Sequence, residues 1–228
     1  MKKLLFAIFA HPDDESFGPS GTILTESLAG TEVHLISLTA GEAGTNPDNV
    51  PDLKAVRLAE WHAAGALMGA HDMHYLGYSD SKLNNSDMLR ASQQIIDLVT
   101  SIAAQSNTNQ VIEFVTSDLN GITGHIDHIV AARAACLAFY RLRESGLNMS
   151  QIRLTCIPAD YLPTHNTDWL YMEPGRPESE IDQIVDAREH NQTIISIMKS
   201  HHSQRGDCEA HLKNRGESIG LNYFRIMK

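Results

Sequence analysis

Apolar runs of strand length alternate with longer helix-like segments along this chain, and that alternation is what most restricts its fold. The strand-like runs cover residues 4–10, 33–39, 73–78, 111–117 and 152–158. Helical spacing of apolar residues is found over residues 53–69 and 91–105, and we expect a final helix over residues 181–200. Strands and helices of these lengths form βαβ units, which build a parallel sheet covered on both faces. The sequence therefore predicts an α/β, Rossmann-like three-layer fold with a mostly parallel sheet flanked by helices.

The size and charge of the chain restrict its organisation and its partners. A chain of 228 residues can bury an ample core without disulfides, and we expect a single domain over residues 1–228. Its formal net charge of −10 argues against broad attraction to nucleic acid or to an anionic membrane. A small-molecule partner fits this balance better. The sequence leaves the oligomeric state open, with a homo-oligomer as one alternative.

The cysteines and the first residues bear on the compartment. Three cysteines, an odd number without a CxxC pair, predict reduced thiols in a cytoplasmic protein. The opening "MKKLLFAIFA" imitates a secretory signal, but its apolar run is short and no small-residue cleavage site follows, so a first buried strand explains it better. No stretch approaches the roughly 18 apolar residues of a membrane span.

Two clusters of acids and histidines follow two of the predicted strands. The first is "HPDDE", residues 11–15, and the second is "GHIDH", residues 124–128. Open α/β sheets bind ligands beyond the carboxyl ends of their strands, so the two clusters can meet there. Catalytic zinc often takes two histidines and one carboxylate and keeps a position open for water. His11, Asp14 and His128 can supply that set, which would leave Asp13 as a general base.

Each cluster also has an interpretation without a metal. "HPDDE" could begin a helix, with Pro12 at its first position and the acids facing the positive end of the helix dipole. His125 and His128 could equally be polar residues that face solvent at another helix start. The occurrence of both clusters at strand ends favours the metal site.

The motifs together resemble a known family. "AHPDDE" followed by a glycine-containing turn, and then "HIDH", is similar to the LmbE-like or PIG-L-like superfamily of zinc-dependent N-acetylglucosaminyl deacetylases. The resemblance extends over nearly the whole chain through "PSGT" (19–22), "LTAGEAGT" (38–45), "RLAE" (57–60), "LGYSDSKL" (76–83) and "HHSQ" (201–204). The first motif is highly specific, whereas the others gain weight from their order.

The resemblance implies a role for each motif residue. It makes His11, Asp14 and His128 ligands of Zn²⁺ and Asp13 the general base. The family's second-motif histidine, which steadies the oxyanion, would be His125, with Asp127 orienting it and favouring an imidazolium. One departure is visible: the family commonly has proline where this chain has Ile126. We expect an altered turn at that position rather than lost activity.

Three further residues are candidates for binding substrate. The resemblance places Arg57 near the substrate, and the alternative is a surface ion pair with Glu60. Asp80 could accept hydrogen bonds from sugar hydroxyls or stabilise a turn. His201 matches the last motif. No role is assigned to the histidines without a partner pattern, which are His34, His62, His71, His74 and His165.

A long loop is expected over residues 159–180, which contain three prolines and three aromatic residues. Trp169 and Tyr171 could belong to a lid or a substrate rim, or the segment could be a plain surface excursion.

The predicted function is removal of an N-acetyl or other N-acyl group from an N-acetylglucosamine-type amino sugar or its conjugate by a zinc-dependent hydrolase. One alternative is a metal-dependent amidase that acts on another N-acyl small molecule. A metal-dependent phosphoesterase is another, since clustered acids and histidines also build two-metal sites. A nucleotide-binding protein is disfavoured because "GPSGT" does not match GxGxxG.

Overall fold

The strands of the chain form one mixed sheet. The computed structural model describes residues 2–105, 109–161 and 171–228. Within them, the sheet has the strand order β3-β2-β1-β4-β5-β7-β6, in which β1 to β5 are parallel and β7 and β6 are antiparallel to their neighbours. The strands are β1 (Lys2–Phe9), β2 (Glu32–Thr39), β3 (Asp72–Tyr78), β4 (Gln110–Ser117), β5 (Met149–Cys156), β6 (Gln183–Asp186) and β7 (Leu221–Met227). The predicted mostly parallel α/β fold is confirmed.

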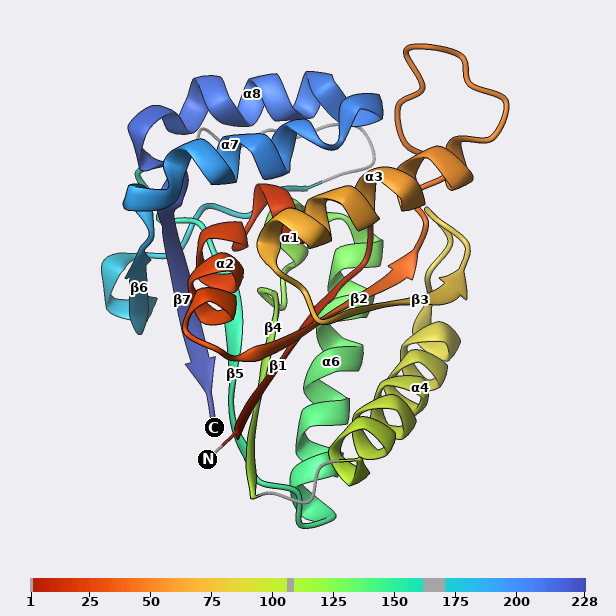
Figure 1. Cartoon of the computed structure of the whole chain (residues 1–228), viewed down its shortest axis with the longest axis vertical. Helices are drawn as coiled ribbons and strands as arrows, with labels where there is room; N and C mark the ends of the chain where they lie inside the picture. The colour runs from red at the N-terminus through yellow and green to blue at the C-terminus, as the bar shows by residue number, and fades with distance from the viewer. Residues whose placement is uncertain (1, 106–108, 162–170) are drawn as a thin grey trace.

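Helices cover both faces of this sheet (Figure 1). The α-helices are α1 (Asp14–Phe17), α2 (Ser20–Leu28), α3 (Leu53–Met68), α4 (Asn85–Ala104), α5 (Gly121–Gly124), α6 (Ile126–Glu144), α7 (Asn191–Lys199) and α8 (Arg205–Arg215). Short 3₁₀ turns lie at Glu178–Glu180, Arg188–His190, His202–Gln204 and Gly216–Gly220. Among the described residues, no helix is long and apolar enough to cross a bilayer.

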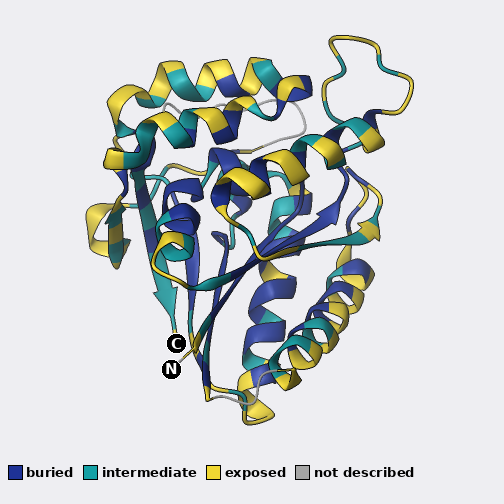
Figure 2. Cartoon of the chain, viewed as in Figure 1, coloured by how far each residue is buried: buried dark blue, intermediate teal, exposed yellow. Residues whose placement is uncertain are grey.

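Alternation along the strands divides the core between the two faces. In β1, Leu4, Phe6 and Ile8 pack with α4 and α6, whereas the residues between them pack with α2, α3 and α7. Successive side chains of a strand point to opposite faces, so a strand buried on both sides is apolar throughout. Figure 2 shows β1 and β2 buried over most of their length. This double burial is why the strands could be recognised as continuous apolar runs.

The helix expected over residues 181–200 is wrong in its first half. Residues 183–186 form β6, which pairs with β7, so that Ile184 lies opposite Tyr223. Helix α7 begins only at Asn191. Isoleucine and valine at positions 184 and 185 favour extended structure, and the unrecognised strand β7 supplies their partner.

The strand order fixes where a ligand can bind. From β1 the chain adds β2 and then β3 on one side, and it then returns to add β4 and β5 on the other side of β1. The position between β1 and β4 is therefore a topological switch point. In open α/β sheets, ligands bind at the carboxyl ends of the strands at that point. Residues 11–15 follow β1 and residues 118–128 follow β4. The topology therefore brings both predicted clusters to the same edge of the sheet, where such a crevice is expected.

Candidate active site

Three predicted metal ligands lie together at the switch point. Nδ1 of His11 is 3.1 Å from Nε2 of His128. The carboxylate oxygens of Asp14 are 3.6 Å from the first nitrogen and 3.2 Å from the second. Ligands bound tetrahedrally to zinc at 2.0–2.1 Å lie about 3.3–3.4 Å from one another. The spacing of these three residues, which we call the carboxyl-end set, therefore fits one tetrahedral cation.

The outer nitrogens of both imidazoles have acceptors. Nε2 of His11 is 3.0 Å from Asp80 Oδ1 and 3.4 Å from Asp127 Oδ2. Nδ1 of His128 is 3.1 Å from the carbonyl oxygen of Gly121. Because carboxylates and carbonyls only accept, hydrogen on these outer nitrogens would leave the inner nitrogens free to bind a cation. Metal-binding histidines have this arrangement, so the hydrogen-bond partners of both rings also fit a cation.

A tight turn after β1 carries two of the acids. The Asp14 carboxylate accepts a hydrogen bond from the backbone N–H of His11 at 2.9 Å. Asp13 has a φ of 120°, a conformation that non-glycine residues rarely adopt and that costs on the order of 1–3 kcal/mol. It occupies the N-cap of the single-turn helix α1, yet its side chain makes no capping hydrogen bond. The Asp13 carboxylate therefore does not serve to cap α1. This argues against the interpretation of residues 11–15 as a helix start and nothing more.

Arg57 holds this turn from the side of α3. Its guanidinium donates to the Asp13 carboxylate at 2.6 Å, to the Pro12 carbonyl at 2.6 Å and to the Gly41 carbonyl at 2.7 Å. A Cβ at position 41 would lie 2.3 Å from the guanidinium, and φ there is +67°, so the close approach requires glycine. This contact explains the first glycine of "LTAGEAGT", Gly41, in physical terms.

The adjacent acids have opposite electrostatic surroundings. Burial raises the pKa of Asp13 to about 7, with the charge of Arg57 opposing the shift. Burial also acts to raise the pKa of Asp14, but the charges and hydrogen bonds of His128 and His11 hold it well below its usual range. Asp14 is thus suited to remain an anionic ligand, while Asp13 is suited to exchange a proton near neutral pH.

His125 is the N-cap of α6, and its ring lies beside the carboxyl-end set. Nδ1 of His125 accepts a hydrogen bond from the backbone N–H of Asp127 at 3.2 Å, which leaves the ring hydrogen on Nε2. The ring centroid is 5.1 Å from that of His11 and 5.0 Å from that of His128. His11, His125 and His128 each offer a nitrogen within 4.8 Å of the others. The histidines at the start of α6 therefore face the site and not only solvent.

The expected imidazolium at His125 is not supported. Burial lowers the pKa of His125, and the neighbouring His128 and His11 lower it further. The Asp127 carboxylate accepts from the backbone N–H groups of Ser81, at 2.7 Å, and Leu83, at 3.2 Å, and it also faces His11. Asp127 thus orients a predicted metal ligand and meets His125 through its own backbone N–H.

The three predicted substrate-binding residues lie behind the carboxyl-end set. Arg57, Asp80 and His201 are 4%, 6% and 0% exposed. Arg57 pairs with Asp13, and the expected surface partner Glu60 accepts instead from Ser203. Their burial favours support of the site from within, and the direct sugar contacts stay a prediction.

Asp80 and His201 each support a different part of the site. Asp80 accepts from His11 and, at 2.8 Å, from the backbone N–H of Ala43, and although burial opposes it, the hydrogen bond and charge of His11 lower the pKa of Asp80 to about 2. Nε2 of His201 is 2.9 Å from the Ser16 hydroxyl, which donates to Glu15 at 2.7 Å. Sequence reasoning missed this buried Glu15–Ser16–His201 row, because His201 and Ser16 are 185 positions apart.

Two large apolar side chains are exposed near the second cluster. Ile126 is 57% exposed at the start of α6, and Tyr171 is 67% exposed. A Cβ on Gly124 would lie 2.0 Å from the Tyr171 carbonyl oxygen, so the backbone of Tyr171 packs on the loop that leads to α6. Trp169, which was expected with Tyr171 at a rim, lies outside the described residues.

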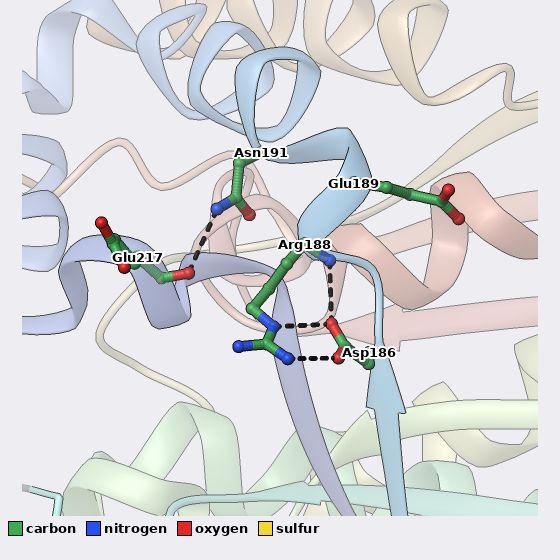
Figure 3. Close-up of a pocket in the computed structure, with 5 residues that line it drawn as sticks. All are labelled: Asp186, Arg188, Glu189, Asn191 and Glu217. Carbon is green, nitrogen blue, oxygen red and sulfur yellow. Dashed lines mark hydrogen bonds and ion pairs between the residues drawn. The ribbon is translucent and has the colours of Figure 1, made fainter.

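A surface hollow elsewhere offers a contrast (Figure 3). It is lined by Asp186, Arg188, Glu189, Asn191 and Glu217. Arg188 donates to both Asp186 oxygens, at 2.9 and 2.6 Å, and the Asn191 amide donates to the backbone carbonyl of Glu217 at 3.1 Å. In this hollow, Arg188 and Asp186 already pair with each other. The carboxyl edge of the sheet at the switch point is therefore the stronger candidate for the active site.

Known proteins similar to this chain match a range that contains both clusters. The sequence model of the PIG-L family, described as GlcNAc-PI de-N-acetylase, matches residues 6–139. A relative from Acidothermus cellulolyticus, named 1D-myo-inositol 2-acetamido-2-deoxy-alpha-D-glucopyranoside deacetylase, is 25% identical over 272 aligned positions that cover 100% of this chain and 90% of the relative.

Two solved structures share the fold. An N,N'-diacetylchitobiose deacetylase from Pyrococcus horikoshii superposes with a TM-score of 0.64 at 23% identity, covering 99% of this chain and 84% of the other. The 4-carboxy-2-hydroxymuconate hydratase GalB from Pseudomonas putida superposes with a TM-score of 0.66 at 15% identity, covering 100% and 97%. At these identities the superpositions establish the fold, and proteins named for different reactions share it.

Proposed function

The chain belongs to the PIG-L family of GlcNAc-PI de-N-acetylases, and from this premise we propose that it hydrolyses the acetamide of a 2-acetamido-2-deoxyglucopyranoside conjugate with a bound zinc ion. The observation that carries the proposal is the carboxyl-end set, whose three donors lie 3.1–3.6 Å apart with Asp13 directly beside them. Two histidines and one carboxylate are a known set for catalytic zinc.

The chain's own residues divide the work of amide hydrolysis. His11, Asp14 and His128 would hold the ion, which when bound acidifies water and polarises the acyl carbonyl. Asp13 accepts a proton from the attacking water and then delivers it to the departing amine, so the net reaction is amide plus water to acetate plus the protonated amine. Its pKa of about 7 suits both transfers.

His125 is assigned to the developing oxyanion. Its capping hydrogen bond fixes the hydrogen on Nε2, so the neutral ring is a donor without becoming an imidazolium. A preorganised donor of this kind is typically worth about 3–4 kcal/mol of transition-state stabilisation. Arg57 holds the carboxylate of Asp13 and the carbonyl of Pro12, and Asp80 and Asp127 orient His11. These three are positioning residues rather than substrate contacts.

The proposed substrate is a small amino-sugar conjugate, as the name of the Acidothermus relative suggests. A net charge of −10 makes nucleic acid a poor partner. The three cysteines are free and buried, which supports a reducing compartment such as the cytoplasm.

Amine release from a panel of conjugates tests the proposal. The zinc-loaded protein is offered N-acetylglucosaminyl-inositol, N,N'-diacetylchitobiose, N-acetylated amino acids, a phosphate monoester and 4-carboxy-2-hydroxymuconate. We expect release from glucosaminyl substrates, loss of release on removal of the metal, and recovery on its return. Release only from N-acetylated amino acids would indicate the other amidase, and turnover of only the last two compounds would overturn the deacetylase assignment.

A further inference from the structure

A second group of histidines lies at the opposite end of the sheet from the crevice. It consists of His34 near the start of β2 and of Asp72 and His74 at the start of β3, and we call it the amino-end set. The two strands are adjacent and parallel, with His34 opposite Asp72 and Ile36 opposite His74. Residues two apart on a strand share a face, so all three side chains belong to the same face of the sheet.

The donor atoms of this set also lie close together. Nδ1 of His34 is 3.3 Å from Nε2 of His74, which is 3.7 Å from Asp72 Oδ2. All three donors lie within 4.8 Å of one another. Two ring nitrogens 3.3 Å apart cannot both carry hydrogen toward each other, so at least one directs a lone pair into the gap. That gap is flanked by a carboxylate.

His34 is held in the state that a metal ligand requires. Its Nε2 is 3.2 Å from Glu32 Oε1, and the other Glu32 oxygen is 2.6 Å from the Lys2 ammonium. The carboxylate accepts the Nε2 hydrogen and leaves Nδ1 with its lone pair facing His74, as Asp80 does for His11. The His34 ring stacks on Phe6 at 4.9 Å and is 2% exposed, so its orientation is fixed by packing.

From this geometry we infer that His34, Asp72 and His74 form a second binding site, for a divalent transition-metal ion such as Zn²⁺, Co²⁺ or Ni²⁺. Two imidazoles and a carboxylate suit these ions better than Mg²⁺ or Ca²⁺, which prefer oxygen donors. Because β3 is the edge strand of the sheet, an ion shared by both strands would fasten that edge to β2. The site is structural in this proposal and does not depend on the proposed function.

The competing arrangement is a metal-free hydrogen bond, in which Nε2–H of His74 donates to Nδ1 of His34. It satisfies both rings with the same heavy-atom distance. Metal stoichiometry separates the two, since the hydrogen-bonded pair binds no ion.

The test counts Zn²⁺ ions per chain after equilibrium dialysis of the purified full-length protein. We expect two ions for the wild type, one for His128→Gln, one for His74→Gln and none for the double variant. In His128→Gln, Zn²⁺ should also slow hydrogen exchange of the amides in β2 and β3, because local opening of the edge then requires release of the ion. His62→Gln, an exposed histidine on α3, is the matched control and should keep both ions.

A second variant protects the test against misfolding of His74→Gln. The Asp72 side chain is 62% exposed, so Asp72→Asn should fold normally while its second Zn²⁺ binds at least tenfold more weakly. Retention of two tightly bound ions by both variants would overturn the assignment. So would a wild type that binds one ion, loses it in His128→Gln and shows unchanged amide exchange in β2 and β3.

Discussion

The carboxyl-end and amino-end sets contain the same three side chains, two histidines and an aspartate, on different supports. His11 and His128 come from loops and helix starts 117 residues apart, next to an aspartate with a φ of 120°. His34 and His74 come from two adjacent strands 40 residues apart, in regular register. One set therefore lies next to strained backbone and the other on two strands that pair in register at these residues.

The surroundings of the two sets differ as much as their supports. At the carboxyl end, Asp13 and His125 stand beside the donors and can accept or donate protons. At the amino end, Phe6, His71 and the Glu32–Lys2 pair surround His34 and fix it in place. The comparison teaches that a donor set selects an ion, whereas the groups next to it decide whether chemistry follows.

The largest expected effect concerns Asp13, the proposed base beside the carboxyl-end set. Asp13→Asn keeps the shape of the side chain but removes the proton acceptor, so kcat for deacetylation should fall by about 10²–10⁴. Metal content should be unchanged. Asp72→Asn, the matched change at the amino end, should alter kcat by less than about twofold. Steady-state kinetics and metal analysis of both variants provide the measurement.

Asp14→Asn separates the two adjacent acids further. It weakens a charged ligand, so affinity for zinc at the carboxyl end should drop. If Asp13→Asn loses the ion while Asp14→Asn keeps it, the two roles are reversed. Equal loss in both variants would mean that both acids bind the metal and that another residue is the base.

The backbone segments that carry the two sets can be compared by removing the positively charged side chain that pairs with an acid in each. Arg57 is buried against Asp13, so Arg57→Gln leaves a buried carboxylate without its partner and should lower the free energy of unfolding by about 3–5 kcal/mol. Lys2 pairs with Glu32 but its side chain is 40% exposed, and Lys2→Gln should cost less than about 1 kcal/mol. Urea denaturation measures both. Similar losses would show that the strained turn is no more dependent on its cation than the strand is.

The carboxylates that hold the first histidine of each set allow a symmetric test. Asp80→Asn should weaken zinc binding at the carboxyl end by about 10–100-fold, since it weakens the acceptor behind His11. Glu32→Gln should have the same effect at the amino end alone. Competition with a chelator of known affinity gives both constants. An Asp80→Asn protein with unchanged affinity but raised KM would instead restore the sugar-binding role first predicted for Asp80.

The smallest effect concerns the backbone at the mouth of the crevice. His125 has φ −61° and ψ 128°, which is the conformation preferred before proline, and Ile126 occupies the first position of α6, where proline is favoured. Ile126→Pro should therefore raise the free energy of unfolding by about 0.4–1 kcal/mol and leave kcat within about twofold. Thermal unfolding and the amine assay check it. A large loss of activity would show that the isoleucine side chain contributes to the site.

This geometry revises one expectation drawn from the sequence. The replacement of the family's proline by Ile126 predicted an altered turn, yet the turn observed would accept proline without change. The strands of the parallel sheet were predictable because residues such as Leu5 and Phe6 are buried on opposite faces and give continuous apolar runs. Strand β6 was missed because its partner β7 is more than thirty residues further along.

The same limit applies to the site. The positions of His11, Asp14 and His128 follow from motifs placed after two strands of one parallel sheet, and they lie together. The contacts of Asp80 with His11 and of Arg57 with Asp13 leave no local pattern, because they join separate segments through burial. His34 and His74 received no role for a similar reason: their pairing depends on strand register, which periodicity does not specify.

The separation of the paired histidines along the chain also determines which set can form first during synthesis. His34 and His74 can pair once β2 and β3 have left the ribosome, whereas His11 has to wait for the start of α6, 117 residues later. Closing the longer loop costs about 1 kcal/mol more in chain entropy than closing the shorter one. A nascent chain can therefore complete its amino-end pair first, and its carboxyl-end set only after β4 and the start of α6 have been made.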